Sequence, residues 1–426
     1  MQIIYNPKKE DWDALLERPA ADNREIMSRV QKIIDSVLSE GDKALKRYAE
    51  EFDGAIIIEL SVSKDEMESA CKQVSTELKK AVQLAKGNIE KFHQTQLRQE
   101  DKIETTPGVT CWRKSVPIEK VGLYIPGGTA PLFSTVLMLA VPAVLAGCEE
   151  IVLCTPADPQ GRIHPAVLYA ADICGVSKIY KAGGAQAAAA MAYGTETIPK
   201  VYKIFGPGNQ YVTTAKMLVS IDGTAVDMPA GPSEVLVIAD EYADPEFIAA
   251  DLLSQAEHGP DSQVILITNS KSTAENAAQE VRRQLKSLPR KDTASASLKN
   301  SRIIVLENLD DAFEAANRYA PEHLILNIKN PESFFGKIKN AGSVFAGPLT
   351  PESAGDYASG TNHTLPTNGY ARSFSGVSVD SFMKKITFQQ MSREGLKNIG
   401  PAIETMAEAE GLTAHKNAVS VRLKCI

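Results

Sequence analysis

Four histidines in the second half of the chain stand near carboxylates, amides or glycines. They are His258 in Gln255–His258, His323 after Pro321-Glu322, His363 after Asp356, and His415 after Glu410, out of six histidines in 426 residues. Imidazole is suited both to binding a divalent metal and to moving protons near neutral pH. The pattern predicts an enzyme whose chemistry is concentrated in the second half of the chain.

Gln255 and His258 are candidate metal ligands. They are three residues apart near the end of a predicted helix that Gly259-Pro260 terminates, so both lie on one face. A polar helix end that faces water explains this pair equally well. Asp356 in a glycine-rich loop and His415 in the C-terminal tail would complete a set of oxygen and nitrogen ligands. Without thiolates, such a set suits zinc or manganese in an open site.

Glu322 and His323 are a candidate pair for proton transfer. Pro321 disfavours helix in the residue before it, so the helix predicted over 311–319 ends there and the pair occupies the turn into the strand 324–326. Ligands of open α/β sheets gather near the ends of strands, and an adjacent acid and base serve two separate proton transfers. The structural alternative is that Glu322 caps a neighbouring helix and His323 is a satisfied, half-buried polar residue.

The elements that position these residues alternate between short apolar runs and helical patterns. Residues 23–52 and 63–98 have the spacing of charged amphipathic helices. Predicted strands then follow at 121–126, 151–154, 178–183, 203–205, 234–239 and 264–267, separated by predicted helices at 133–148, 164–174, 185–192, from 209, 244–258 and 272–288. The alternation predicts an α/β fold with parallel, helix-covered sheets in two units, divided near 228–233, where proline and glycine cluster.

The C-terminal part is predicted to be less regular. Residues 348–370 are dense in Gly, Ser, Thr, Asn and Pro, and a loop of this length in a compact domain is more often functional than idle. A helix is predicted over 393–410, interrupted at Gly400-Pro401, and the tail 412–426 would pack on its own domain or reach a neighbouring subunit.

Three glycine-containing loops stand between a predicted strand and a predicted helix. They are Pro126–Thr129, Gly183–Gln186 and Gly206–Gln210. Glycines there allow backbone amides to approach a phosphate at a helix N-terminus. None has the GxGxxG pattern with an acidic residue about 20 positions later, so the standard dinucleotide fingerprint is absent. Each loop alone is a tight connection, but three together favour nucleotide binding.

Composition points to a small-molecule partner. The net charge of −7 and the absence of a long basic run predict no binding to nucleic acid or to an anionic membrane. The N-terminus lacks a hydrophobic signal core and no later stretch approaches about 18 apolar residues, so we expect a cytoplasmic protein. Six cysteines without CxxC spacing predict reduced thiols. Cys148 and Cys154 are interpreted as buried small residues in preference to thiohemiacetal-forming nucleophiles.

Seven segments, in order along almost the whole chain, resemble histidinol dehydrogenases. They are Val121–Cys148, Phe205–Val212, Asp227–Glu234, Leu252–Asp261, Tyr319–Leu324, Gly355–His363 and Glu410–Val419. The resemblance implies two incomplete Rossmann-like domains with small helical terminal segments. We accordingly expect an N-terminal arm (1–20), a first domain with the substrate and zinc site (21–126 and 233–377), an NAD-binding domain (127–232) and a C-terminal helical tail that contacts the partner subunit (378–426).

The resemblance also implies a reaction, which is the oxidation of L-histidinol to L-histidine through histidinaldehyde, with two NAD and one zinc ion per subunit, as the last step of histidine biosynthesis. Zinc would be bound by Gln255, His258, Asp356 and, across a homodimer, His415 of the partner subunit. His323 would take the hydroxyl proton, and Glu322 would activate water to hydrate the aldehyde.

The same resemblance implies a wider set of contacts. Substrate would be contacted by Ser233, Gln255, His258, Glu322, His323, Asp356, His363, Glu410 and His415, with Glu410 also donated by the partner subunit. NAD would be contacted by Tyr124, Gln186 and Asn209. Two alternatives keep the fold: a dehydrogenase of another small alcohol, such as a sulfonated diol, and a non-catalytic metal or nucleotide sensor. Glu322, Glu410 and His415 argue against the first, because a substrate that carries an amine and an imidazole is the one that needs them.

Overall fold

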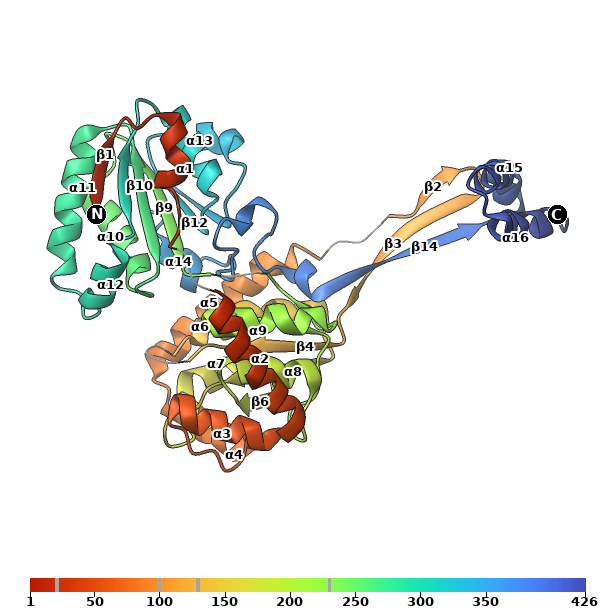
Figure 1. Ribbon diagram of the computed structural model, residues 1–426, viewed down its shortest axis with the longest axis horizontal. Coiled ribbons are helices and arrows are strands. Elements are labelled where there is room, and N and C mark those ends of the chain that lie inside the picture. The colour runs from red at the N-terminus through yellow and green to blue at the C-terminus, as the bar shows by residue number, and fades with distance from the viewer. Residues whose placement is uncertain (20–22, 98–100, 128–130, 229–230) are drawn as a thin grey trace.

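The computed structural model describes residues 1–19, 23–97, 101–127, 131–228 and 231–426, arranged as two α/β lobes and a long projecting arm (Figure 1). The helices and strands alternate through both lobes, which confirms the predicted α/β fold. No helix in the described ranges is both long enough and apolar enough to cross a membrane.

The first lobe is built on a six-stranded parallel sheet. Its strands, in spatial order, are β1 (Gln2–Tyr5), β11 (Arg302–Val305), β10 (Gln263–Thr268), β9 (Glu234–Ala239), β12 (His323–Asn327) and β13 (Ser343–Ala346). Successive side chains of a strand point to opposite faces, so Val235 and Val237 pack under one helical layer and Leu236 and Ile238 under the other. The two layers are α10 (Pro245–Ala256), α11 (Lys271–Leu285) and α12 (Lys291–Ser297), and α1 (Trp12–Leu15) with α13 (Leu309–Tyr319).

The second lobe is built on a five-stranded parallel sheet. Its strands are β6 (Lys178–Lys181), β5 (Glu150–Thr155), β4 (Lys120–Tyr124), β7 (Lys203–Phe205) and β8 (Ala225–Val226). The chain starts in the centre at β4, winds outward through β5 and β6, and returns to add β7 and β8 on the other side. One face is covered by α4 (Lys64–Gln73), α5 (Thr76–Gln94), α6 (Phe133–Ala146) and α7 (Pro165–Ile173), and the other by α2 (Asn23–Glu40), α3 (Asp42–Asp53), α8 (Gly184–Tyr193) and α9 (Gln210–Ile221).

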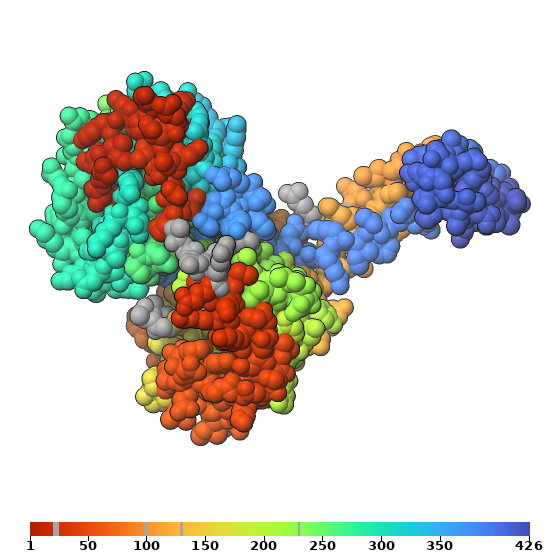
Figure 2. Space-filling model, in the orientation of Figure 1, coloured from red at the N-terminus to blue at the C-terminus, as the bar shows by residue number. Residues whose placement is uncertain are grey.

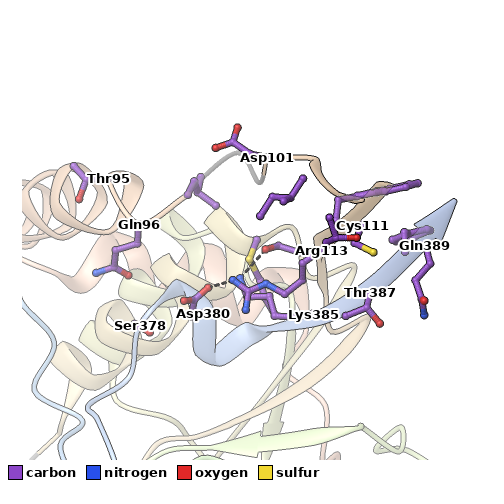
Figure 3. Close-up of a pocket in the computed structure, with 17 residues that line it drawn as sticks. Thr95, Gln96, Asp101, Cys111, Arg113, Ser378, Asp380, Lys385, Thr387 and Gln389 are labelled. Carbon is purple, nitrogen blue, oxygen red and sulfur yellow. Dashed lines mark hydrogen bonds and ion pairs between the residues drawn. The ribbon is translucent and has the colours of Figure 1, made fainter. Parts of the chain in front are cut away.

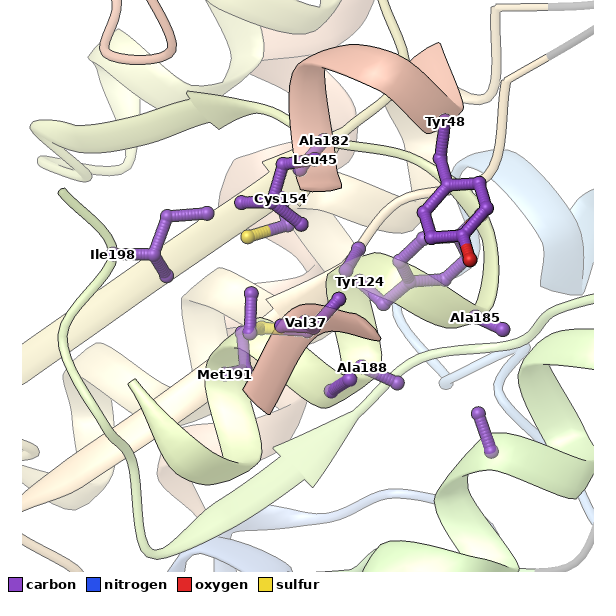
Figure 4. Close-up of a cluster of buried hydrophobic side chains, with 14 of the residues drawn as sticks. Val37, Leu45, Tyr48, Tyr124, Cys154, Ala182, Ala185, Ala188, Met191 and Ile198 are labelled. Carbon is purple, nitrogen blue, oxygen red and sulfur yellow. The ribbon is translucent and has the colours of Figure 1, made fainter. Parts of the chain in front are cut away.

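The predicted division of the chain between the two domains is wrong in its first 126 residues. Figure 4 shows Val37 and Leu45 of the N-terminal helices packed with Tyr124 and Cys154 of the second lobe, so the helices of residues 23–94 and the strand 120–124 belong to that lobe, whereas 103–117 belong to the arm. The predicted N-terminal arm is instead an edge strand of the first sheet, because β1 pairs with β11. Amphipathic spacing identifies the apolar face of a helix but not the sheet that buries it.

The arm is an antiparallel ribbon that carries two helices at its tip (Figure 1). Strands β2 (Ile103–Thr106), β3 (Val109–Pro117) and β14 (Met383–Met391) form the ribbon, and α15 (Arg393–Ala409) and α16 (Thr413–Leu423) form the tip. The predicted helical tail 378–426 is helical over α15 and α16, but the prediction is wrong for its first part, because β14 pairs with β3 along nine residues. The predicted interruption at Gly400-Pro401 is also wrong, since α15 runs through Pro401.

The predicted loop 348–370 contains one short helix, α14 (Glu352–Tyr357). Short 3₁₀ turns complete the fold at Lys9–Asp11, Pro331–Lys337, Tyr370–Arg372 and Val379–Phe382. Between α14 and the last of these turns the chain passes from the first lobe to the second, because Val377 and Val379 are buried in the core of the second lobe. The loop thus lies where both lobes can contribute to one site.

Candidate active site

Glu322 and His323 lie at the amino end of β12 in the first lobe, between β9 and the edge strand β13. The helix before them ends at Tyr319, and Ala320 takes a left-handed conformation with φ of 53° that turns the chain sharply into the strand. His323 is the first residue of β12 and pairs with Val235 of β9. Both side chains of the pair are buried. The sequence therefore placed the pair correctly, in the turn into a strand.

The backbone of Glu234 holds both members of the pair. The Glu234 N–H donates to Oε2 of Glu322 at 2.9 Å, and Nδ1 of His323 lies 3.0 Å from the Glu234 carbonyl oxygen. A carbonyl oxygen only accepts, so Nδ1 carries a proton and Nε2 is the nitrogen that can accept one. Nε2 has no hydrogen-bond partner among the described residues. Glu322 therefore does not cap a helix through this contact, as the alternative proposed, because its Oε2 accepts from the first residue of strand β9.

Three side chains could hold a metal ion beside this pair. His258, Glu352 and Asp356 each offer a ligand atom, and these atoms lie within 4.8 Å of one another. Gln255, on the same helical turn as His258, is buried, and its Oε1 has no hydrogen-bond partner among the described residues. A buried amide oxygen without a donor is costly unless a cation or a ligand satisfies it.

Glu352 is the residue of this group that the sequence did not reveal. Its Oε2 accepts a hydrogen bond from Ser254 Oγ at 2.7 Å, whereas its buried Oε1 has no partner among the described residues and lies 3.9 Å from Nε2 of His323. Asp356 Oδ1 lies 3.8 Å from the same Nε2. Glu352 and Asp356 are four residues apart on α14, and hence share one face. That spacing was the available signal, but the segment was predicted to be a loop.

His363 connects this cluster to the second lobe. Its Nδ1 lies 2.9 Å from the backbone carbonyl oxygen of Asp356, and its Nε2 lies 3.1 Å from Oγ1 of Thr135 on α6. The ring therefore donates through Nδ1 and accepts from the hydroxyl through Nε2. Ser233 directly precedes Glu234, whose backbone contacts the pair. Of the nine predicted substrate contacts, the fold brings six together in this cluster: Gln255, His258, Glu322, His323, Asp356 and His363.

Electrostatics and burial in the cluster raise the pKa values of His323, Glu322 and Glu352 and lower that of Asp356. Burial alone would lower the pKa of His323, but the carboxylates of Glu322, Asp356 and Glu352 outweigh it and raise the pKa to about 10. Burial raises the pKa of Glu322 to about 8, although the charge of His323 opposes this shift. The pKa of Asp356 lies below its usual value despite burial, because the His323 and His363 rings favour its ionised form. A cation is thus favoured at this position.

The predicted NAD contacts lie in the second lobe, at the carboxyl ends of its strands. Tyr124 is the last residue of β4, and its hydroxyl accepts from the N–H of Gly184 at 3.1 Å. Gln186 is buried on α8, and its Oε1 has no hydrogen-bond partner among the described residues. Asn209 caps α9 by accepting from the N–H groups of Tyr211 and Val212 at 3.0 and 3.1 Å. The three side chains therefore lie along one edge of one sheet.

The glycine-containing loops lie along the same edge. Gly206 has φ of 124°, and a Cβ there would lie 2.1 Å from the carbonyl oxygen of Tyr124, so the loop after β7 requires glycine. Lys216 Nζ donates to the Gly206 carbonyl oxygen at 2.9 Å, and the Gly206 N–H donates to Oδ2 of Asp227 at 2.8 Å. In the first predicted loop, Gly128 and Thr129 lie outside the described residues.

Glu410 and His415 do not join this cluster within one chain. Glu410 directly follows α15 and His415 lies on α16; both side chains are exposed, and both helices are at the tip of the arm, away from the lobes (Figure 2). A hollow of about 1130 Å³ lies along the base of the arm. Figure 3 shows its lining, where Lys385 Nζ donates to Asp380 at 2.8 Å and to Ser115 at 2.6 Å. This hollow contains none of the predicted site residues.

The two cysteines near the predicted cofactor region are not suited to nucleophilic attack. Cys154 is buried in the hydrophobic cluster of Figure 4, and burial raises its thiol pKa far above neutrality. Burial also raises the pKa of the half-buried Cys148 to about 12. A reactive cysteine needs the thiolate form near neutral pH. Burial therefore supports the interpretation of both as structural residues.

Comparisons with known proteins agree on one family. The profile described as histidinol dehydrogenase matches residues 16–423. The chain is 61% identical over 426 residues to the histidinol dehydrogenase of Bacteroides thetaiotaomicron, covering 100% of both chains, and 52% identical to that of Escherichia coli O6:H1 over 427 residues, covering 98% of both. The crystal structure of histidinol dehydrogenase from Elizabethkingia anophelis superposes with a TM-score of 0.98 at 57% identity, covering 100% of this chain and 98% of that one.

A more distant structure shares the fold alone. An acetylating aldehyde dehydrogenase from Geobacillus thermoglucosidasius superposes with a TM-score of 0.50 at 15% identity, covering 89% of this chain and 96% of that one.

Proposed function

The chain belongs to the histidinol dehydrogenase family, and we propose that its buried cluster oxidises L-histidinol to L-histidine in two steps, with two NAD and one zinc ion per subunit. It is an NAD-dependent oxidoreductase that acts on a CH–OH group in histidine biosynthesis. The residue assignments rest on one observation. Glu322 and His323 lie beside a group of potential metal ligands, although these residues come from distant segments of the sequence.

The residues beside the catalytic pair suit zinc. The unpartnered Oε1 of Gln255, the imidazole of His258 and the carboxylate of Asp356 are oxygen and nitrogen donors without a thiolate, and His415 of the partner subunit would complete the set. Binding of zinc would supply a positive charge that orients the nitrogen atoms of histidinol and offsets the carboxylates that now keep His323 protonated.

In the first oxidation, Nε2 of neutral His323 accepts the hydroxyl proton of histidinol while the carbinol carbon loses a hydride. The Glu234 carbonyl oxygen binds Nδ1–H, which fixes the ring and leaves Nε2 as the basic atom. NAD supplies the hydride acceptor in both oxidations.

In the second oxidation, ionised Glu322 accepts a proton from water while the water oxygen bonds to the aldehyde carbon. The resulting hydrate loses a second hydride and a proton, and the product is a carboxylate. The positive charge on His323 lowers the pKa of Glu322, so the proton taken in the first step favours the ionised Glu322 that the second step requires.

NAD is proposed to bind along the carboxyl ends of β4, β6 and β7, with contacts from Tyr124, Gln186 and Asn209. The unpartnered Oε1 of Gln186 supports this position, as does the backbone of the Gly206 loop, which no larger residue could replace without a clash. His363 would place substrate between the lobes, because it contacts Asp356 on one side and Thr135 on the other.

A homodimer would complete each site. Glu410 and His415 stand at the tip of the arm, so a site that needs both must receive them from a second copy of the chain. A second copy would also fill the hollow along the base of the arm.

The function is tested by counting NADH released from a limiting amount of L-histidinol by the purified enzyme. We expect two NADH for each histidinol, and loss of activity with a chelator that added zinc restores. One NADH, or none, would contradict the two-step assignment.

The shared site is tested by mixing two inactive variants, His323→Asn and His415→Asn, under conditions that exchange subunits. A mixed dimer contains one site with an intact His323 and an intact His415 of the partner subunit, so activity should return to about a quarter of wild type at random exchange. If His415 acted within its own chain, the mixture would stay inactive.

A further inference from the structure

A buried ion pair lies directly behind the catalytic pair and has no part in the proton transfers described above. Arg18 Nε and Nη2 lie 2.5 and 2.8 Å from the two carboxylate oxygens of Glu234, which is a bidentate contact. The side chain of Glu234 is 3% exposed and that of Arg18 is 17% exposed. Replacing a buried ion pair by apolar groups is often neutral or stabilising, so stability alone does not explain this pair.

The pair is connected to both sides of the turn that carries Glu322 and His323. Arg18 Nη2 also donates to the Tyr319 carbonyl oxygen at 2.9 Å, and its guanidinium lies 3.9 Å from the centre of the Tyr319 ring. This contact comes immediately before Ala320, the residue in the left-handed conformation. On the other side, the backbone N–H and carbonyl of Glu234 bind Glu322 and His323.

The Glu234 carboxylate also contacts the loop that follows α14 and His363. Its Oε1 accepts from the Asn368 N–H at 2.9 Å, in the loop that follows Asp356 and His363. Three distant segments therefore converge on one carboxylate: the stretch after α1, the start of β9 and this loop.

We propose that Arg18 and Glu234 are positioning residues that hold the β9 backbone and the turn before β12 in the arrangement needed for both proton transfers. This inference deepens the proposed function and rests on it. Without Arg18, the buried Glu234 carboxylate would keep a charge with no cation beside it, and it would move toward solvent. This movement would displace the backbone atoms that hold Glu322 and His323.

The test compares Arg18→Met, Glu234→Gln and the double variant. Arg18→Met should lower kcat for oxidation of histidinol and of added histidinaldehyde by about 100-fold, the scale expected when a catalytic group moves by about 1 Å. KM for histidinol and bound zinc should stay within about twofold of wild type, because His258 directly follows α10 and Asp356 lies on α14, neither of which the pair contacts. The double variant has no unpaired charge and should regain stability, but kcat should stay low because the positioning contacts are absent; full recovery of kcat would mean that only the unpaired charge harms the site.

Arg283→Met is the matched control. Its exposed contacts with Glu246 and Glu280 lie in the same lobe, and its loss should leave kcat unchanged.

If Arg18→Met lowers the melting temperature but keeps kcat in both half-reactions, the pair is structural and the inference is overturned. If Arg18→Met does not fold, Arg18→Lys carries the test, because lysine keeps the charge but not the bidentate contact; an unchanged kcat again overturns the inference. If the wild-type enzyme releases two NADH per histidinol, the proposed function holds even when the positioning role of Arg18 and Glu234 is overturned.

Discussion

The two lobes have related folds, but their proposed functional residues lie at opposite ends of the strands. In the first lobe, Glu234 and His323 are the first residues of β9 and β12. In the second lobe, Tyr124 is the last residue of β4, and the Gly183 and Gly206 loops follow β6 and β7. Ligands of open α/β sheets ordinarily bind at the carboxyl ends, so the second lobe follows this rule and the first does not.

The difference follows from which helix ends face each site. At the amino ends of the strands in the first lobe, α10 and α13 present their C-termini, whose carbonyl groups carry partial negative charge and favour cations. At the carboxyl ends in the second lobe, α8 and α9 present their N-termini, whose N–H groups favour phosphate. The choice of edge thus suits one lobe to a metal and a cationic substrate, and the other to a dinucleotide.

The largest expected effect is at the amino edge of the first sheet. Glu322→Gln keeps the size of the side chain but cannot accept a proton, so oxidation of added histidinaldehyde should fall by about 1000-fold. The first oxidation should fall much less, whereas His323→Ala should slow it most. Single-turnover measurements of each half-reaction separate the two. Equal losses in both steps for Glu322→Gln would refute the division of roles.

The next largest effect is expected on zinc affinity when a proposed metal ligand is replaced. His258→Asn should weaken zinc affinity by about 100-fold or more, since loss of even an outer partner of a metal ligand costs about 10–100-fold. Competition with a zinc indicator measures this without relying on activity. His164→Asn is the matched control, because His164 caps α7 in the second lobe and asparagine is a good cap. Unchanged zinc affinity in His258→Asn would remove this residue from the metal group.

A change at the carboxyl edge of the second sheet should alter KM for NAD without altering zinc affinity. Gly206→Ala places a methyl group against the Tyr124 carbonyl oxygen and should raise KM for NAD by about 10-fold or more, with zinc affinity unchanged. Gly223→Ala is the control, because Gly223 also has positive φ, 96°, but nothing lies near its added Cβ. Equal changes in KM for both variants would mean that backbone strain, and not the clash, disturbs the site.

The metal-free protein should lose stability as pH rises from about 5 to 10. The folded-state pKa values of Glu322 and Glu352, about 8, lie above the unfolded value of 4.5, and that of His323, about 10, lies above 6.5. The folded state therefore keeps protons that the unfolded state has released, and this disfavours folding as pH rises. Thermal unfolding in the presence of a chelator measures the slope, which Glu322→Gln should reduce. A slope of opposite sign would contradict these shifts.

The smallest effect should come from Asn209. Its Oδ1 caps α9, so Asn209→Ala should cost about 1 kcal/mol of unfolding free energy and should raise KM for NAD only a few-fold. Asn209→Ser is the control, because serine keeps the cap and loses the amide. If Asn209→Ser binds NAD like wild type, the residue serves the helix and not the cofactor.

The order of elements was predictable from the sequence, but their partners were not. Runs such as 235–239 and 264–267 are continuously apolar because both faces of the sheet are covered, and the structure has strands there. The ribbon strand β14 gave no such signal, since most of its side chains are exposed and its pairing with β3 joins distant parts of the chain. The packing of helices α2 to α5 on the second sheet was also missed, because the apolar spacing of a helix does not indicate which sheet buries it.

The candidate site was predicted where residue type alone suggests chemistry. Glu322, His323, Gln255, His258 and Asp356 are side chains of recognisable function, and they meet in the structure. Glu352 was missed because its relation to Asp356 depends on a helical turn inside a glycine-rich segment. The role of Glu234 was also hidden, because it acts through its backbone and through strand register, which no motif encodes.

The ribbon of the arm has a consequence for synthesis of the chain. Its strand β3 leaves the ribosome before most of either sheet, whereas its partner β14 leaves after both are complete. The unpaired edge of β3 is therefore exposed throughout most of translation, when such edges are prone to aggregate. The two C-terminal helices follow β14 in the chain, so in the proposed homodimer they can reach a partner subunit only after β14 has been synthesised.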